Sequence, residues 1–166
     1  MDFNDTPEEA KFRKEVSDWL KENVKKIPEA NDASENSSLE RARAWMQIKH
    51  ESGWACLHWP KEYGGRDATA MERVIYSQEE AKYRLPNGFY EIGQGMAGPV
   101  MMMYATEEQK EKYLPPMANG KEIWCQLFSE PGAGSDLAGI KTKSELDGDT
   151  WTVNGQKVWT SGAHYS

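Results

Sequence analysis

The chain has 166 residues, of which 38% are hydrophobic and 28% are charged, which is enough apolar content for one domain and the start of another. Its net charge of −7 and scattered lysines and arginines exclude the broad basic face that nucleic-acid binding requires. No apolar run approaches the ~18 residues needed to cross a bilayer, so we expect a cytoplasmic protein without a membrane span.

The N-terminal part of the chain carries a clear helix signal. Thr6, Pro7 and Glu9 combine a capping hydroxyl, a proline in the first turn and a carboxylate that closes a capping box. An apolar stripe at helical spacing follows, made of Phe12, Val16, Trp19, Leu20 and Val24. The polar stretch over residues 31–38 then predicts a loop.

Two more helices are expected on either side of an irregular connection. The first should run from about Ser38 to Gly53, where glycine ends it. Proline and paired glycines exclude a regular element over residues 54–66. The next helix should follow Thr69 and face inward with Met71, Val74, Ile75 and Ala81.

Residues 92–104 are nearly uncharged and rich in methionine and glycine. They predict a buried helix with an irregular first half. Flexible thioethers also suit apolar ligands, so Met96 and Met102 are compatible both with core packing and with the lining of an acyl tunnel. Thr106 begins another capping box, whose helix should reach about Leu114.

The periodicity changes from helical to β-like near the end of the chain. Strands are expected at residues 123–129, 141–146, 151–153 and 157–160. The Asn154–Gly155 pair between two of these runs is typical of a hairpin turn. The expected fold class is therefore α+β: an all-α helical domain over residues 1–122, then the first strands of an antiparallel β-barrel-like domain over residues 123–166. Because about four strands without closure leave open edges, we expect this second domain to be incomplete.

The glycine-rich run from Glu130 to Asp136 is the strongest candidate for a binding site. Its spacing fits neither a Walker loop nor a dinucleotide-binding turn, and Leu137 excludes a nucleophile elbow. Successive amides, with the hydroxyls of Ser129 and Ser135, are compatible with an anion site for a pyrophosphate or a flavin carbonyl. An ordinary loop between strands is the alternative.

A second candidate lies at the end of the last predicted strand. The indole of Trp159 is compatible with stacking on a planar cofactor, with hydroxyls of Thr160 and Ser161 beside it, and equally with core packing. The three histidines share no ligand spacing, and Cys56 and Cys125 are expected to be buried, reduced thiols. The residues predict no metal site and offer no persuasive general base.

Two motifs, FSEPGAGSD at residues 128–136 and NGQKVWTS at residues 154–161, together resemble the acyl-CoA dehydrogenase family. The first is among the family's most specific signatures, and the second follows at the family's spacing. Residues 53–65 and 106–114 match as well, so the resemblance covers nearly the whole chain. It is nearest to bacterial members acting on acyl-CoAs with branched, dicarboxylic or steroid side-chain acyl groups.

The resemblance implies the N-terminal part of a flavin-dependent enzyme. Such an enzyme oxidises the α,β bond of an acyl-CoA thioester, and hydride passes to FAD. The family fold continues into a C-terminal helical bundle that is absent here, so the chain is expected to be a truncated and inactive part. No catalytic residue is assigned, because the family's glutamate base would lie beyond Ser166.

The resemblance also implies a set of binding residues. Those implied to hold FAD are Gln126, Leu127, Phe128, Ser129, Gly134, Ser135, Trp159, Thr160 and Ser161. Gln126 departs from the tyrosine or small residue of many members. Ser135 would also contact CoA, and Met96 and Met102 would belong to the substrate site.

The implied partners are the acyl-CoA substrate, an electron-transferring flavoprotein as electron acceptor, and further copies in a dimer or tetramer. The context would be fatty-acid and lipid metabolism. Two other classes of function stay open. One is a binding module that kept the helical domain and lost catalysis; the other is a subunit that obtains its missing parts from a partner chain.

Overall fold

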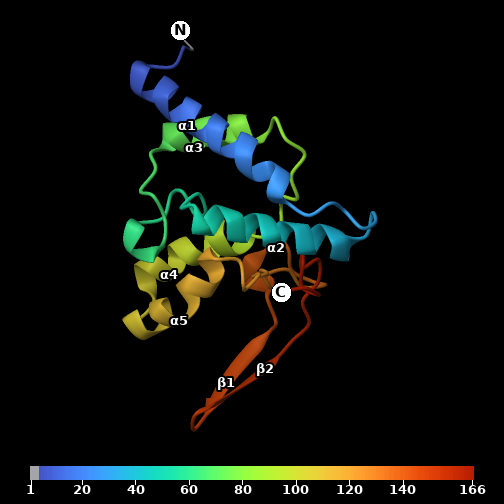
Figure 1. The fold of residues 1–166 in the computed structure, drawn as a ribbon. Helices are drawn as coiled ribbons and strands as arrows, with labels where there is room; N and C mark the ends of the chain where they lie inside the picture. The colour runs from blue at the N-terminus through green and yellow to red at the C-terminus, as the bar shows by residue number, and fades with distance from the viewer. Residues whose placement is uncertain (1–3) are drawn as a thin grey trace. The chain divides into compact units, whose positions relative to one another are not determined.

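The computed structural model describes residues 4–166, which form two compact units (Figure 1). The first unit ends at Ile123, and the second is Trp124–Ser166. The first is helical, and the second carries an antiparallel pair of strands. The predicted fold class, a helical domain followed by antiparallel strands, is therefore confirmed. Over residues 4–166, no helix is both long and apolar enough to cross a membrane.

The helical unit is built from α1 Pro7–Asn23, α2 Glu35–Glu51, α3 Ala70–Glu80, α4 Gly98–Tyr104 and α5 Glu107–Ala118. Short 3-10 turns occupy Val24–Lys26 and Lys61–Tyr63, and a π-helical turn, Gly93–Ala97, leads into α4. The capping boxes predicted at Thr6 and Thr106 start α1 and α5, and the structure adds a third at Thr69, which starts α3. In each, the capping threonine and the residue three positions later bond each other's backbone N–H.

The start of α2 differs from the sequence prediction. The helix begins at Glu35 rather than near Ser38, inside the stretch expected to be a loop. The reason is Ser34, whose side chain accepts a hydrogen bond of 3.1 Å from the Ser37 N–H and so caps the helix.

The end of α5 also differs, because the helix continues through Pro115 and Pro116 to Ala118. Proline removes an N–H donor from a helix, and this led to an expected end at Leu114. The carbonyls of both prolines nevertheless keep partners: Asn119 donates to Pro115 at 3.0 Å, and Glu122 donates to Pro116 at 3.1 Å. The turn therefore closes despite the missing donors.

Aromatic rings occupy the centre of the helical unit. The ring of Trp54 lies 5.4 Å from that of Trp19 and 5.7 Å from that of Tyr76, and Trp45 lies 5.3 Å from Trp19. The guanidinium of Arg66 lies 3.9 Å from the Trp54 ring. These contacts join α1, α2 and α3 to the irregular stretch between α2 and α3, as aromatic pairs in a core commonly do.

Trp59 anchors that irregular stretch. Its side chain is fully buried, and its Nε1 donates to the Gln94 carbonyl at 2.8 Å. Two glycines allow neighbouring parts of the backbone to lie close to Trp59. A Cβ atom at Gly65 would lie 2.0 Å from the Trp59 carbonyl oxygen, and one at Gly98 would lie 2.2 Å from the indole.

The methionine-rich helix is more exposed than predicted. The large side chains of its π turn and α4 that lie largely in solvent are Met96, Val100, Met103 and Tyr104, and Met103 is 71% exposed. Small residues make the buried contact instead, because Gly93 and Gly98 are buried and Gly98 packs on the Trp59 indole. The expected inward face of α3 is wrong in the same way: Met71, Val74 and Ala81 are exposed, whereas Ile75 is buried.

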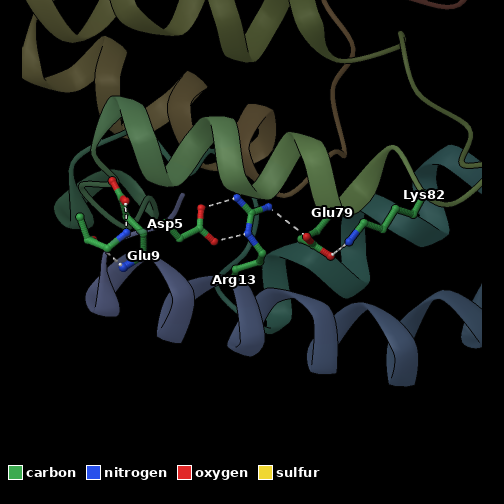
Figure 2. A network of polar contacts seen from close by, with 6 residues as sticks. Asp5, Glu9, Arg13, Glu79 and Lys82 are labelled. Carbon is green, nitrogen blue, oxygen red and sulfur yellow. Dashed lines mark hydrogen bonds and ion pairs between the residues drawn. The ribbon is translucent and has the colours of Figure 1, made fainter. Parts of the chain in front are cut away.

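An ion-pair network joins α1 to α3, which lie side by side (Figures 1 and 2). The Arg13 guanidinium donates to both Asp5 oxygens, at 2.5 and 2.7 Å, and to Glu79 at 3.0 Å. The Glu79 side chain is 3% exposed and also accepts from Lys82. Burial alone raises the pKa of Glu79, but hydrogen bonds from Lys82 and Arg13 outweigh it and hold the pKa below its ordinary value of 4.5.

We expect this network to make the fold less stable in acid. The pKa of Glu79 is lower in the folded state than in the unfolded chain. Its contribution to the free energy of unfolding is therefore complete at pH values above the unfolded pKa of 4.5 and is lost as the pH falls through the folded-state pKa. Arg13→Met should cost about 2 kcal/mol at neutral pH, since it removes a hydrogen bond to a buried charge. The free energy of unfolding of this variant should also fall less steeply than that of the parent chain between about pH 6 and about pH 3. Urea unfolding across that range measures both effects.

Lys14→Met is the matched control, since Lys14 pairs with Asp18 on the exposed face of the same helix. Exposed pairs contribute little, so its unfolding curve should follow that of the parent chain. If Arg13→Met and Lys14→Met unfolded with the same stability and the same dependence on pH, the Arg13 network would have no such role.

The second unit contains one hairpin within its described residues, β1 Lys143–Asp147 and β2 Thr150–Asn154. The register pairs Asp147 with Thr150, so the two-residue turn lies at Gly148 and Asp149 (Figure 1). The predicted turn at Asn154–Gly155 is wrong. Gly148 has φ 57° and supplies the positive φ that such hairpins need at their first turn position.

Gly155 serves a close contact instead, because a Cβ atom there would lie 2.1 Å from the Thr142 hydroxyl oxygen. The strands expected over residues 123–129 and 157–160 are irregular. One backbone hydrogen bond links them, from the Val158 N–H to the Ser129 carbonyl at 3.0 Å. A single bond brings the two segments together but does not make a ladder.

Candidate functional site

A buried carboxylate connects the two sequence motifs of the second unit. Glu130 is 5% exposed and accepts from the N–H groups of Lys141 at 2.7 Å and Thr142 at 3.0 Å. It also accepts from the Lys157 ammonium at 2.9 Å, and this ammonium donates to the Phe128 carbonyl at 3.0 Å. Three separate stretches of chain therefore meet at one carboxylate, an arrangement called here the Glu130 junction.

The Glu130 junction is strongly electrostatic. The Thr142 side chain, the Lys141 N–H and the Lys157 ammonium lower the pKa of Glu130 to about 2. The carboxylate therefore stays ionised throughout the neutral pH range. Since hydrogen bonds to a charged acceptor are stronger than those between neutral groups, the junction holds these segments in place across that range.

The glycine loop itself is closed by a tight turn. The Glu130 N–H donates to the Ala133 carbonyl at 2.8 Å, and the Ala133 N–H donates back at 3.1 Å. Pro131 occupies the second position of this turn, where its fixed φ is favourable. The turn leaves Gly134 and Ser135 exposed immediately after it.

Large apolar side chains next to the junction are exposed. Leu127 and Phe128 are both more than half exposed, and Trp159 is 84% exposed. Trp159 also has φ 55°, a conformation that bulky residues rarely adopt and that often marks a functional position. Exposed rings beside a polar junction fit a flat ligand with one apolar face.

Backbone donors lie in the same unit. Within residues 4–166, no hydrogen bond engages the N–H groups of Gly134 or Ser135. A Cβ atom added at Gly132 or Gly134 would meet nothing within 4 Å, so a ligand has room to approach the backbone there. Rings, hydroxyls and free amides of this kind fit a flavin, whose ring is planar and whose diphosphate is anionic.

The structure brings together part of the predicted site. The bond from Val158 to Ser129 places Phe128 and Ser129 next to the segment that carries Trp159 and Thr160. The remaining predicted residues of this unit are Gln126, Leu127, Gly134, Ser135 and Ser161, of which Gln126 is half-buried and the others are exposed. Met96 and Met102 lie in the helical unit, Met96 exposed and Met102 half-buried.

Sequence reasoning did not single out Glu130 or Lys157 individually. The available signal was an acidic residue in one motif and a basic residue in the other. That signal becomes informative only when the fold pairs the two charges.

Other chemical groups do not assemble a site. Among the described residues, no cluster of histidine, cysteine, aspartate and glutamate could hold a metal ion. Both cysteines are free, but Cys125 is half-buried rather than buried as expected. Burial raises the pKa of the Cys56 thiol to about 12, so this thiol stays protonated and unreactive.

The helical unit contains a cavity of about 330 Å³ beside α2 and α3. Glu80 and Glu91 are the acidic residues that line it, and Glu80 already accepts from Trp45 at 3.3 Å, from Tyr76 at 3.1 Å and from Lys49 at 3.5 Å. A carboxylate with three donors has little capacity left for a ligand. Glu80 therefore belongs to the core of the helical unit.

Two family models match the chain. Residues 6–121 match the N-terminal domain of acyl-CoA dehydrogenases, and residues 125–166 match the middle domain of the same family. The chain is 41% identical over 160 residues to the acyl-CoA dehydrogenase IpdE1 of Mycobacterium tuberculosis, a match that covers 93% of this chain and 42% of that protein. It is 31% identical over 160 residues to a short-chain-specific acyl-CoA dehydrogenase of Clostridium acetobutylicum, covering 96% of this chain and 41% of that protein.

Solved structures agree with these matches. The chain aligns over its full length with the ChsE4–ChsE5 complex of Mycobacterium tuberculosis, with a TM-score of 0.77 and 33% identity, and covers 42% of that chain. A steroid acyl-CoA dehydrogenase, Tcur3481–Tcur3483, aligns with a TM-score of 0.76 and 30% identity, and 43% of its chain is covered. The present chain thus spans less than half the length of these relatives.

Proposed function

The chain belongs to the acyl-CoA dehydrogenase family, and we propose that it supplies the helical domain and the flavin-contacting loops of an enzyme that oxidises acyl-CoA thioesters at the α,β bond. The observation that carries this proposal is the Glu130 junction, which holds both family motifs together beside exposed rings and free amides. When bound, FAD would accept the hydride that leaves the β-carbon of the substrate.

The residues of this chain would bind and orient the cofactor. Phe128 and Ser129 would lie along the flavin ring, with Gln126 and Leu127 beside them. Trp159 would stack on the ring, and the hydroxyls of Thr160 and Ser161 would bond to its polar edge. The free amides at Gly134 and Ser135 would hold the diphosphate, and Ser135 would also contact CoA. Met96 and Met102 would line the acyl site.

The relatives suggest a substrate class and a partner. Because one aligned structure is named a steroid acyl-CoA dehydrogenase, we favour a bulky acyl group over a short one. Both aligned structures are named as pairs of proteins, which supports a partner-dependent subunit: a second acyl-CoA dehydrogenase-like chain rather than identical copies in a dimer or tetramer. An electron-transferring flavoprotein is the proposed acceptor. Free cysteines fit a step of lipid metabolism in the reducing cytoplasm.

A chimera tests the flavin site. Residues 1–166 replace the aligned part of IpdE1, and the purified protein is assayed for bound FAD and for dye reduction with acyl-CoA. Wild-type loops should retain FAD, whereas Trp159→Ala should weaken FAD binding about tenfold, the equivalent of ~1.4 kcal/mol of lost stacking. The 166-residue chain alone should show no turnover.

Trp151→Ala is the matched control, because Trp151 is an exposed indole on β2, outside both motifs. It should leave FAD binding unchanged. A chimera that lost its flavin equally with either substitution, or kept it equally with both, would contradict the stacking role of Trp159. Turnover by the isolated chain would contradict the view that it is only part of the enzyme.

A further inference from the structure

We propose that Glu130 and Lys157 are positioning residues: their buried ion pair fixes the glycine loop and the Trp159 segment relative to each other, so that both reach one flavin. The proposal rests on the proposed function and adds to it a pair of residues that touch neither cofactor nor substrate. Their effect would pass through the residues bonded to them.

The Glu130 carboxylate has little capacity left for a ligand. Three donors lie within 3.0 Å of its oxygens, and one of them is the Lys157 ammonium. The Glu130 and Lys157 side chains are both largely shielded from water. Removing one partner of such a pair leaves the other charge uncompensated, and this disturbs the surrounding chain.

A short path of bonds joins this pair to the proposed flavin contacts. Lys157 bonds to the Phe128 carbonyl as well as to Glu130, and the next residue, Val158, bonds to the Ser129 carbonyl. These three bonds attach two consecutive residues of one motif to three consecutive residues of the other. Two of the bonds thus end directly on proposed flavin contacts, Phe128 and Ser129. The third proposed contact, Trp159, follows Val158 in the chain.

Little else holds these segments. Of the apolar side chains in residues 124–166, only Ala133 is buried. No regular ladder links the two motifs, and the hairpin strands are exposed along their whole length. With so little apolar burial, the polar bonds at Glu130 determine the local geometry. A disturbed pair should therefore change the flavin site without changing the helical unit.

The test uses Glu130→Gln and Lys157→Met in the IpdE1 chimera, with FAD affinity and the visible absorbance spectrum of the bound flavin as readouts. Glu130→Gln removes the charge at nearly constant shape, and Lys157→Met removes the donor. Each should weaken FAD binding at least about tenfold, equivalent to ~1.4 kcal/mol, and alter the flavin spectrum. The thermal unfolding of the helical unit should not change.

Two further variants make the result specific. Lys157→Arg keeps the charge, so it should retain more FAD than Lys157→Met does. Glu145→Gln removes a carboxylate from the exposed strand β1 and should behave like the parent. In the 166-residue chain itself, Glu130→Gln should speed amide hydrogen exchange at Lys141, Thr142 and Val158, whose N–H groups bond within or next to the junction.

The outcomes distinguish a failure of the positioning role from a failure of the proposed function. A parent chimera that binds no flavin would overturn the proposed function, and the positioning role would fall with it. A parent that binds FAD while Glu130→Gln and Lys157→Met bind it equally well would overturn the positioning role alone. If Glu130→Gln unfolded the second unit, Lys157→Met would decide, because unchanged FAD affinity and an unchanged flavin spectrum in that variant would contradict the proposal.

Discussion

Replacing Trp59 with alanine should lower the free energy of unfolding of the helical unit by about 3–5 kcal/mol, the usual cost of deleting a large buried aromatic side chain. The indole is fully buried and packs directly against Gly98. Its loss would leave a cavity in the irregular stretch between α2 and α3 and would remove the hydrogen bond that the Gln94 carbonyl accepts from the indole. Urea unfolding followed by far-ultraviolet circular dichroism measures the change.

Two variants separate packing from hydrogen bonding at this position. Trp59→Phe keeps most of the ring volume but removes the donor, and it should cost about 1 kcal/mol through the lost hydrogen bond to the Gln94 carbonyl. Trp151→Ala, on the exposed face of the hairpin, should leave the stability of the helical unit unchanged. If Trp59→Ala were as stable as Trp151→Ala, the core assigned to Trp59 would be wrong.

Gly65→Ala should be nearly as damaging, at about 3 kcal/mol, the upper end of the usual cost of overpacking. The added Cβ would lie 2.0 Å from the Trp59 carbonyl oxygen and 2.4 Å from its carbonyl carbon. Because both atoms belong to the backbone, no side-chain rotation relieves the clash. The stretch from Trp59 to Gly65 would have to move, and the same unfolding assay reports it.

Gly95→Ala is the matched control for this substitution. A Cβ atom at Gly95 meets nothing within 4 Å, and its φ is not positive. Alanine is preferred over glycine in helical segments by about 1 kcal/mol, so Gly95→Ala should be neutral or slightly stabilising. Equal stability of Gly65→Ala and Gly95→Ala would show that the chain tolerates a side chain beside Trp59.

Local signals predicted the helices well. The capping boxes at Thr6, Thr69 and Thr106 are complete within four residues, so their geometry does not depend on the rest of the fold. Ser34 was missed because a polar run of serine and asparagine offers several caps, and sequence alone did not choose among them. The helix starts after Thr6, Thr69 and Thr106 thus followed from neighbouring residues.

Burial was predicted less well, because it depends on what a helix packs against. Met103 and Val74 are apolar residues at helical spacing, yet both are exposed. Gly98, which has no side chain to suggest a core position, packs closely on the Trp59 indole. Periodicity identifies an apolar face, but the partner of that face is a tertiary property.

The hairpin turn and the candidate site show the same limit. Asn154–Gly155 has the stronger turn signature, but the close approach of Thr142 accounts for that glycine, and the chain turns at Gly148. The Glu130–Lys157 pair joins residues 27 positions apart, and only the folded chain brings the two charges together. Motif residues such as Phe128 and Trp159 were named from family resemblance, whereas the junction between them required the structure.

The most direct test of the account is an anaerobic titration of the FAD-loaded IpdE1 chimera with acyl-CoA thioesters that carry straight, branched and steroid side-chain acyl groups. We predict that at least one thioester bleaches the visible absorbance of the oxidised flavin and is converted to its α,β-unsaturated product in matching amount. A chimera that retains FAD on the loops of this chain, but whose flavin stays oxidised with every thioester, would contradict the assignment as part of an acyl-CoA dehydrogenase.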